Sequence, residues 1–293
     1  MTPQRIHKRI PKWTWAHRST AALFLLFLFL GRFEWFALLK GSTTSTRLFD
    51  ILRLADPLAA LEVILASRQL HAPLLVAAGL IIFFYALVGR AFCGWVCPLG
   101  LHLELNHTVR QRVQRSLRRR KRRLPDLALP RQTKYGLLAL ALGLSFATQL
   151  PVFQLVSPIN LLSRSIVFAP EAGLVIVGVI ILVEYVSPRT WCHALCPLGA
   201  FYSLIGRWGR VRVLIDQERE RQERPCGLCT YACPINIRVL EDHVRKGKTT
   251  VDDPECMRCG LCIDGCSRGN LRLGVSLPAA RREIAETLTP NRT

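Results

Sequence analysis

The stretch Cys256-Met-Arg-Cys259-Gly-Leu-Cys262-Ile-Asp-Gly-Cys266 has three cysteines spaced three residues apart and a fourth four residues later. Thiolates at this spacing hold [4Fe–4S] clusters, because three of them on one tight loop reach three irons of the same cube. In proteins with two clusters, the last cysteine of such a run binds the neighbouring cluster. The stretch therefore predicts one iron–sulfur cluster and requires a second cysteine run.

That second run lies upstream and reads Cys226-Gly-Leu-Cys229-Thr-Tyr-Ala-Cys233-Pro. A zinc site is the main alternative, but zinc sites usually pair two C-x-x-C knuckles, and a triple run with an offset second run fits them poorly. Exchanging the last cysteines of the two runs assigns the ligands of two clusters. The predicted ligands are Cys256, Cys259, Cys262 and Cys233 for the first cluster, and Cys226, Cys229 and Cys266 for the second.

The second site lacks one cysteine. Its expected first ligand falls at position 223, where the chain has Glu223. Three interpretations stay open: a [3Fe–4S] cluster, a [4Fe–4S] cluster completed by Glu223 or another oxygen ligand, or an empty site. Because three cysteines keep the spacing, we expect a second cluster of one of the first two kinds.

The composition indicates a membrane protein. Of the 293 residues 50% are hydrophobic, and the formal net charge is +20. Soluble domains are seldom both that apolar and that basic. A nucleic-acid-binding protein would gather basic and aromatic residues on one folded face, whereas here the basic residues flank apolar runs. We therefore expect membrane association and no nucleic-acid partner.

Four apolar runs separated by basic loops predict four transmembrane helices. The basic residues at 5–18, 110–134 and 207–212 lie on one side of these runs, so both termini are expected in the cytoplasm. The predicted location is the bacterial inner membrane, which the chain would cross several times. The expected spans are residues 21–39, 72–89, 136–153 and 172–186.

The two halves of this region repeat each other. Each half has an apolar run, a helix start at Asp56-Pro57 or Ser157-Pro158, a second apolar run and a C-x-x-x-C-P-L-G motif. Asp56 can cap a helix that Pro57 begins, since proline needs no amide partner there. The repeat predicts two parallel halves related by an axis along the membrane normal, with both cysteine motifs close together.

The two repeated motifs are Cys93-Gly-Trp-Val-Cys97-Pro and Cys192-His-Ala-Leu-Cys196-Pro. Cysteines at i and i+4 lie on one helix face, and the following proline can begin a new helix. The four thiols can hold a metal or cluster, act as a redox dithiol pair, or be inert packing groups. We predict a redox or metal role in which they act as one unit.

Glu184, inside the fourth expected span, is either a proton acceptor for a quinol or an interfacial glutamate.

The expected architecture is an α-helical membrane domain of four spans in two parallel repeats, followed by a small α+β domain like a bacterial ferredoxin. The first domain covers residues 1–215 and contains both C-x-x-x-C-P motifs. The cytoplasmic iron–sulfur domain covers residues 216–275, with a helix over 237–246 between its cysteine runs. Residues 276–293 form a C-terminal tail.

The paired C-x-x-x-C-P motifs, the terminal cysteine runs and the segment Leu48-Phe-Asp-Ile-Leu-Arg-Leu-Ala-Asp-Pro57 occur together. In this combination the chain resembles the NapH/MauN family, the ferredoxin-type membrane proteins of periplasmic nitrate reductase and methylamine-utilisation gene clusters. The resemblance covers nearly the whole chain. The family usually has a cysteine where this chain has Glu223, so the resemblance does not carry over a full pair of [4Fe–4S] clusters.

The resemblance implies an electron-transfer protein. In the nitrate-reductase branch it implies a quinol dehydrogenase subunit that passes electrons to a partner iron–sulfur or cytochrome protein and on to a periplasmic enzyme. In the methylamine branch it implies only electron transfer linked to amine oxidation. The segments Gly41-Ser-Thr-Thr and Asp56-Pro-Leu-Ala-Ala-Leu-Glu62 favour this branch slightly. One rival is an assembly factor whose thiols reduce a metal or mature a partner enzyme. Another is a structural anchor for a soluble redox partner. Clusters that quinol reduces distinguish the first hypothesis from both rivals.

Overall fold

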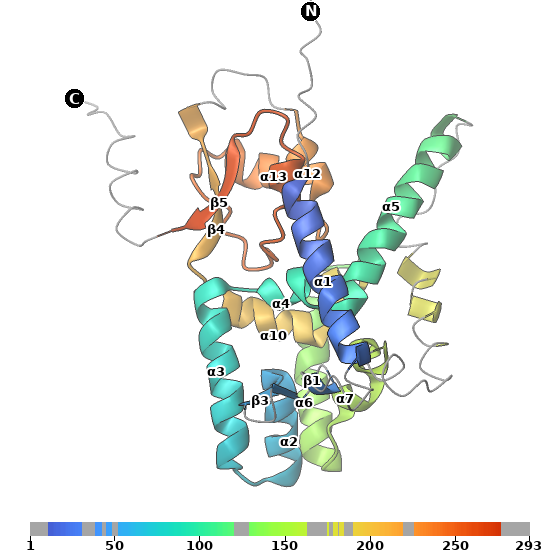
Figure 1. The fold of residues 1–293 in the computed structure, drawn as a ribbon, viewed down its shortest axis with the longest axis vertical. Coiled ribbons are helices and arrows are strands. Elements are labelled where there is room, and N and C mark those ends of the chain that lie inside the picture. Colours follow the sequence, from blue (N-terminus) through green and yellow to red (C-terminus); the bar gives the residue numbers. More distant parts are fainter. Residues whose placement is uncertain are drawn as a thin grey trace, which may run out of the picture.

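The computed structural model describes residues 11–30, 39–42, 45–48, 52–119, 129–162, 175, 178–180, 182–184, 190–218 and 226–276. Its helical part occupies the lower half of Figure 1, and a small unit of two strands and short helices occupies the upper end. The C-x-x-x-C-P motifs lie where these two parts meet, since Cys93 and Cys192 pack against the cores of both.

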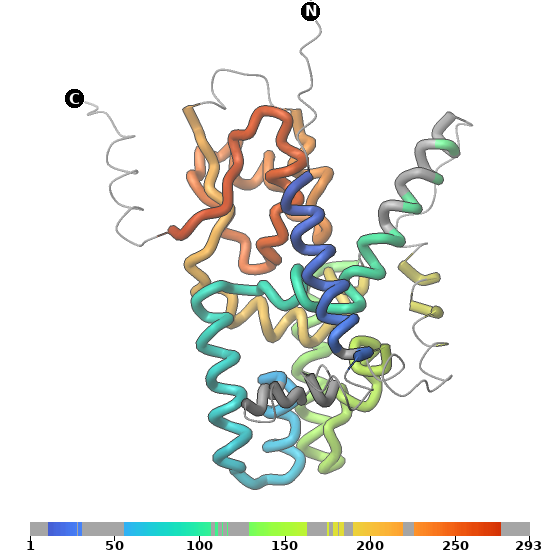
Figure 2. The backbone as a smooth tube through the Cα atoms, in the orientation of Figure 1, coloured from blue at the N-terminus to red at the C-terminus, as the bar shows by residue number. Residues whose placement is uncertain are grey.

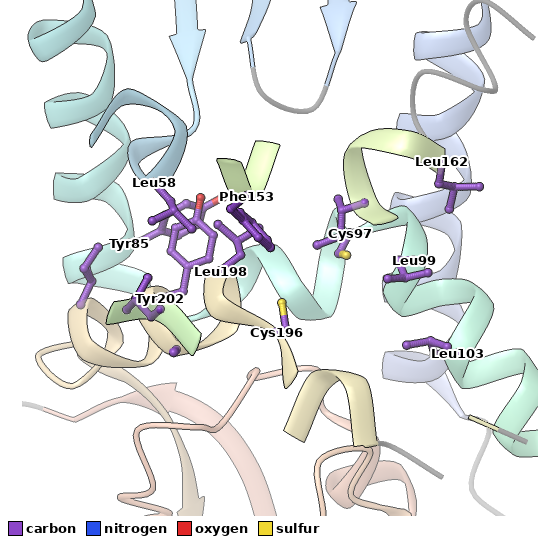
Figure 3. Close-up of a cluster of buried hydrophobic side chains, with 14 residues drawn as sticks. Leu58, Tyr85, Cys97, Leu99, Leu103, Phe153, Leu162, Cys196, Leu198 and Tyr202 are labelled. Carbon is purple, nitrogen blue, oxygen red and sulfur yellow. The ribbon is translucent and has the colours of Figure 1, made fainter. Parts of the chain in front are cut away.

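Three helices form the base of the helical part. They are α2 (Pro57–Ser67), α3 (Ala72–Val88) and α6 (Thr133–Thr148), which run side by side along the long axis (Figure 1). The helix α10 (Pro197–Gly206) crosses above them and contacts both α3 and α6. The core between these helices includes the buried side chains of Leu58, Tyr85, Leu198 and Tyr202 (Figure 3).

The N-terminal helix α1 (Lys12–Leu30) lies beside the C-terminal unit, although the two are at opposite ends of the chain (Figure 2). Thr14 donates its backbone N–H and its hydroxyl to Oδ2 of Asp264, at 2.7 and 2.8 Å. Further along the chain, α4 (Ala91–Trp95) leads into α5 (Pro98–Arg119), which extends away from the body of the molecule (Figure 1).

Three short strands follow the first helix and pair as an antiparallel sheet. They are β1 (Leu39–Ser42), β2 (Ser45–Leu48) and β3 (Leu52–Ala55). Gly41 of β1 lies opposite Thr46 of β2, which in turn lies opposite Leu54 of β3. No strands were predicted here, and the first expected span would have continued to Leu39, the first residue of β1.

The prediction of four transmembrane helices is wrong for the part of the chain that the structure describes. No helix in these ranges is long and apolar enough to cross a membrane. A span needs about 20 apolar residues, but α3 has 17 and α6 has 16. The 19 residues of α1 include Lys12, His17 and Arg18 in its first two turns. The multi-pass inner-membrane location rested on these spans and is corrected with them.

Much of the fourth expected span, residues 172–186, lies outside the described residues. The same holds for residues 1–10, which carry part of the basic flank, and for the C-terminal tail beyond residue 276.

The internal repeat is visible in the local structure. The helix α2 begins at Pro57, and a helical segment begins at Pro158. The short α4 precedes α5, which begins at Pro98, and the π-helical turn η2 (Trp191–Leu195) precedes α10, which begins at Pro197. Proline suits these positions because its fixed φ is helical and its missing N–H would have no intrahelical partner. The prediction that these prolines begin new helices is confirmed.

The C-terminal unit is built on the antiparallel pair β4 (Val211–Ile215) and β5 (Leu271–Val275), with Val213 opposite Leu273. Strand β4 thus precedes the expected domain start at residue 216. A buried core holds the strands against short helical turns. These turns are α12 (Leu228–Ala232), η3 (Leu240–Val244) and α13 (Leu261–Asp264).

Asp56 caps α2 and also ties it to α10. Its Oδ2 accepts the N–H of Ala59 at 3.2 Å, and its Oδ1 accepts the hydroxyl of the buried Tyr202. Asp56→Ala removes the cap and leaves this hydroxyl without its partner, so we expect the free energy of unfolding to fall by about 2–4 kcal/mol. Urea unfolding measures the change. Tyr202→Phe keeps the cap and should lose less, whereas an Asp56→Ala protein as stable as the wild type would contradict this account.

Candidate iron–sulfur sites

One small cavity in the C-terminal unit is lined by cysteines from both runs. Three come from the loop that leads into α13 and from α13 itself, and the fourth follows the end of α12. Thiolates that converge on one cavity are the donor set of a [4Fe–4S] cluster. The cysteines are Cys233, Cys256, Cys259 and Cys262, the four predicted ligands of the first cluster.

The loop that carries three of these cysteines turns through two residues with left-handed backbone. Arg258 has φ 54° and Gly260 has φ 78°. A Cβ on Gly260 would lie 2.6 Å from side-chain atoms of Trp13, so α1 packs closely against the loop there. Glycine meets both requirements, because it adopts positive φ freely and has no Cβ.

A second small cavity is lined by the three cysteines predicted for the second cluster, Cys226, Cys229 and Cys266. Arg268 and Asn270 also line it. Residue 223, where the fourth ligand was expected, lies outside the described residues. The structure therefore places three of the predicted ligands together.

Burial raises the pKa of several of these thiols: that of Cys262 well above its ordinary value, and that of Cys229 to about 11. Such thiols stay protonated and unreactive unless a metal takes the place of the proton. No three His, Cys, Asp or Glu side chains within the described ranges are arranged to bind a single metal ion.

A third group of cysteines lies between the helical part and the C-terminal unit. Gly100 donates its N–H to Sγ of Cys97 at 3.4 Å, and Gly199 donates its N–H to Sγ of Cys196 at 3.3 Å. The second cysteine of each motif therefore sits at the start of the helix that follows. Both side chains are buried in the helical core (Figure 3). Burial, and after it the nearby Cys93, raise the pKa of Cys196 to about 11.

The first cysteine of each motif faces the C-terminal unit. Cys93 and Cys192 are half-buried and pack against both hydrophobic cores. Burial raises the pKa of Cys192, and the charges of Glu184 and of the other three cysteines raise it further, so all four thiols are within electrostatic reach of one another. We call Cys93, Cys97, Cys192 and Cys196 the four-cysteine site. The structure brings the two motifs together, although a helix ends between the cysteines of each pair.

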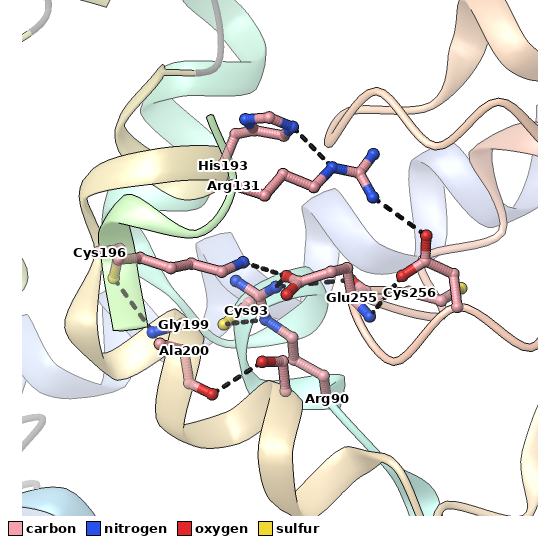
Figure 4. Close-up of polar contacts among 12 residues, drawn as sticks. Arg90, Cys93, Arg131, His193, Cys196, Gly199, Ala200, Glu255 and Cys256 are labelled. Atoms are coloured by element: carbon pink, nitrogen blue, oxygen red, sulfur yellow. Dashed lines mark hydrogen bonds and ion pairs between the residues drawn. The ribbon is translucent and has the colours of Figure 1, made fainter. Parts of the chain in front are cut away.

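A buried ionic network connects the four-cysteine site to the first cluster site (Figure 4). Arg90 donates through Nε to Sγ of Cys93 at 3.4 Å and through Nη1 to Oε2 of Glu255 at 2.5 Å. Lys134 pairs with the same carboxylate oxygen, and the Tyr135 hydroxyl donates to Oε1 of Glu255 at 2.9 Å. Burial would raise the pKa of Glu255, but Arg90 and Lys134 outweigh burial and lower it. The carboxylate is therefore ionised, directly before Cys256 in the chain.

Glu184, predicted as a proton acceptor or an interfacial glutamate, lies close to the second cysteine motif. Its side chain is buried, and Oε1 accepts the N–H of Trp191, next to Cys192. Two other groups were not predicted from the sequence: the network around Glu255 and the hydrogen bond between His17 and Glu104. Neither has a local signal, because the partners are far apart in the chain.

Two cysteine-lined cavities in one small α+β unit define the class of this protein: it is an iron–sulfur protein of the ferredoxin type, suited to electron transfer. The chain matches the family described as "4Fe-4S binding domain" over residues 70–125 and 170–215. These two segments contain the four-cysteine site. The chain therefore holds at least one [4Fe–4S] cluster.

Full-length relatives agree with this class. The chain is 32% identical over 259 residues to the ferredoxin-type protein NapH of Escherichia coli K12, covering 85% of each chain. It is 34% identical over 226 residues to the methylamine utilization ferredoxin-type protein MauN of Paracoccus denitrificans, covering 76% of each. A putative electron transport protein of Escherichia coli K12, YccM, is 27% identical over 75% of this chain and 60% of its own length. No solved structure matches the chain.

The chain belongs to the NapH/MauN family of ferredoxin-type proteins.

Proposed function

We propose that this protein transfers electrons from a quinol to a partner redox protein, an iron–sulfur protein or a cytochrome, that serves nitrate reduction or methylamine utilisation. The observation that supports this most is the continuity of its cysteine sites. Cys93 and Cys192 of the four-cysteine site pack against the same buried core that contains Cys233 and Cys266. A shared core brings the predicted redox centres side by side, which supports electron transfer between them.

In this proposal Cys233, Cys256, Cys259 and Cys262 hold a [4Fe–4S] cluster, and Cys226, Cys229 and Cys266 hold a second cluster, [4Fe–4S] or [3Fe–4S]. A bound cluster supplies a one-electron carrier. The protein's own groups keep the sites dry and set their charge. Arg90 places a cation beside Cys93, and Arg268 lines the second cavity. Cations near a cluster favour its reduced form, which carries one more negative charge.

The pathway is proposed from the relatives alone. NapH and MauN carry names that refer to ferredoxin-type proteins, and the MauN names add methylamine utilisation. This chain has similar identity to both. Either pathway needs the same chemistry, in which two-electron oxidation of a donor is divided into single-electron steps toward a partner.

The direct test is anaerobic mixing of the full chain with a short-chain ubiquinol, followed by visible absorption and paramagnetic resonance. We expect partial bleaching of the iron–sulfur absorption and a signal from the reduced cluster. Dithionite, which reduces clusters without a quinol site, is the control. Clusters that dithionite reduces and quinol leaves oxidised would contradict the proposal and favour an assembly or anchoring role.

We propose that the four-cysteine site works as one unit, since all four thiols are within electrostatic reach of each other. Cys93→Ser alone should abolish most quinol-dependent reduction, and adding Cys192→Ser should cost little more, because residues of one site lose function non-additively. Iron content of the C-terminal sites must stay normal for a valid comparison. Two single variants with full activity would show instead that the site only packs the helices.

The second cluster is tested through Glu223. We expect about seven irons per chain from the two C-terminal sites if the second cluster is [3Fe–4S], and about eight if an oxygen ligand completes a cube. Glu223→Cys restores the usual fourth thiol and should convert about seven irons to about eight. The count is made in variants without the cysteines of the four-cysteine site, so that iron bound there is not included. A count near four irons would mean that the second site is empty.

A further inference from the structure

A cavity of about 300 Å³ opens between α1, α5 and the C-terminal unit. Its walls include Cys93 and Cys192 of the four-cysteine site and Cys259 of the first cluster site. It shares only one of the four cysteines of that cluster site, so the two cavities are distinct. Most of the remaining wall is apolar and includes Ala21 and Leu101. Ligand sites commonly combine an apolar wall with a few polar groups that fix orientation.

The polar groups on this wall form a buried acid–base pair. His17 Nε2 lies 2.6 Å from Oε2 of Glu104, and Arg18 lies 2.6 Å from the other carboxylate oxygen. His17 Nδ1 lies 2.9 Å from the carbonyl oxygen of Trp13. That carbonyl can only accept, so Nδ1 carries a hydrogen. The 2.6 Å contact between Nε2 and Oε2 is a hydrogen bond, so these two atoms share one proton.

This pair differs from an ordinary surface ion pair. His17 is 3% exposed, and its ring packs edge-on against Trp95 at 6.4 Å between centroids. Arg18 is more exposed, at 33% of its side chain. The pair therefore lies between the cavity and solvent, because the Glu104 side chain is 14% exposed.

Resting on the proposed quinol oxidation, we propose that this cavity binds the quinol ring and that the His17–Glu104 pair accepts the protons that the quinol releases. A quinol becomes a quinone by losing two electrons and two protons. The oxidant would be the iron–sulfur cluster that Cys259 and its partner cysteines would hold, which would take the electrons one at a time. Each O–H bond breaks as its proton passes to the pair, and the proton that Nε2 and Oε2 already share is released to solvent at the partly exposed Glu104 carboxylate. The pair is then ready for the second proton.

The site also provides the base that the first step of quinol oxidation needs. A quinol is a poor reductant until a proton leaves, so a base must lie within hydrogen-bond reach of its hydroxyl. The His17–Glu104 pair is such a base, and it lines the same cavity as cysteines of the four-cysteine site and of the first cluster site. No covalent bond forms between the protein and the ring.

Binding is tested by filling the cavity. Ala21 is 3% exposed and lines the cavity, so Ala21→Trp should weaken binding of a short-chain ubiquinone about tenfold or more, measured by equilibrium dialysis with the full chain. Leu101→Trp fills the cavity from α5 and is an independent second test, in case Ala21→Trp fails to fold. Leu23, on the same helix but 50% exposed, supplies the control Leu23→Trp, which should bind normally. Normal binding by both filled variants would overturn the assignment.

Chemistry is tested with Glu104→Gln, which keeps the shape and hydrogen bonds of the side chain but is not a base. We expect ubiquinone binding to be retained, reduction of the clusters by ubiquinol to slow about 100-fold, and reduction by dithionite to be unchanged. If ubiquinol reduces this variant at the wild-type rate, the pair is only a structural tie and the proposal fails while the proposed function stands. If ubiquinol fails to reduce even the wild type, the proposed function fails and this site with it.

Discussion

Cys259→Ala should remove the first cluster and abolish quinol-dependent electron transfer. This thiol lines both the first cluster site and the neighbouring cavity of about 300 Å³. Its loss therefore affects the cluster and the wall of the proposed quinol site. Iron content should fall by about four per chain, because a cube that loses one of four thiolates is held weakly. Iron and acid-labile sulfide analysis measures this loss.

Met257→Leu is the matched control. Met257 lines the same two cavities but carries a thioether that is not an expected ligand. Exchange of methionine for leucine conserves volume and usually costs less than about 1.5 kcal/mol. We expect this variant to keep its iron. Full iron content in Cys259→Ala would contradict the ligand assignment.

Glu255→Ala should cause the largest loss of stability among the substitutions considered. Glu255 is the carboxylate that pairs with both Arg90 and Lys134, and all three side chains are buried. Removing it leaves two cations without their partner in a dry site, and breaking a buried ion pair in this way costs about 3–5 kcal/mol. Chemical unfolding of the full chain measures the change.

The comparison for Glu255 is Asp252→Ala. Asp252 pairs with Arg212 at 2.6 Å, but the two side chains are 29% and 16% exposed. Exposed pairs contribute about 0–1 kcal/mol, so this variant should unfold close to the wild type. Equal effects of the two substitutions would show that the network around Glu255 contributes no more than a surface ion pair.

The sequence predicted what depends on local spacing. The grouping of Cys256, Cys259 and Cys262 follows from their separation in one loop, and the helix starts at Pro98 and Pro197 follow from the geometry of proline. Exchanging the last cysteines of the two runs also grouped Cys233 with the three cysteines that line its cavity. Spacing within one loop and the geometry of proline are local, because a few covalent bonds determine them.

Predictions that depended on composition over longer stretches were wrong. An apolar run shows that a segment is hydrophobic, but it does not show where the helix ends. The first run was expected to continue to residue 39, whereas α1 ends at Leu30 and a strand begins at Leu39. The helices α3 and α6 end after 17 and 16 residues, short of a span.

The polar networks could not be predicted because their partners are distant in the chain. Arg90 and Glu255 are 165 residues apart, and His17 and Glu104 are 87 apart. A single basic or acidic residue in a basic chain gives no sign of its partner. The repeat did predict that the four-cysteine site comes together, but it contained no information about the cation that contacts Cys93.

The Mössbauer spectrum of the iron-labelled full chain, prepared anaerobically and reduced with ubiquinol, tests the central claim most directly, because it identifies each cluster type and its oxidation state together. The account predicts a [4Fe–4S] component that is lost in Cys259→Ala, a second component of [3Fe–4S] or [4Fe–4S] type, and a shift of at least one of them to the reduced form by ubiquinol. A spectrum without a [4Fe–4S] component, or one that ubiquinol leaves fully oxidised, would contradict it.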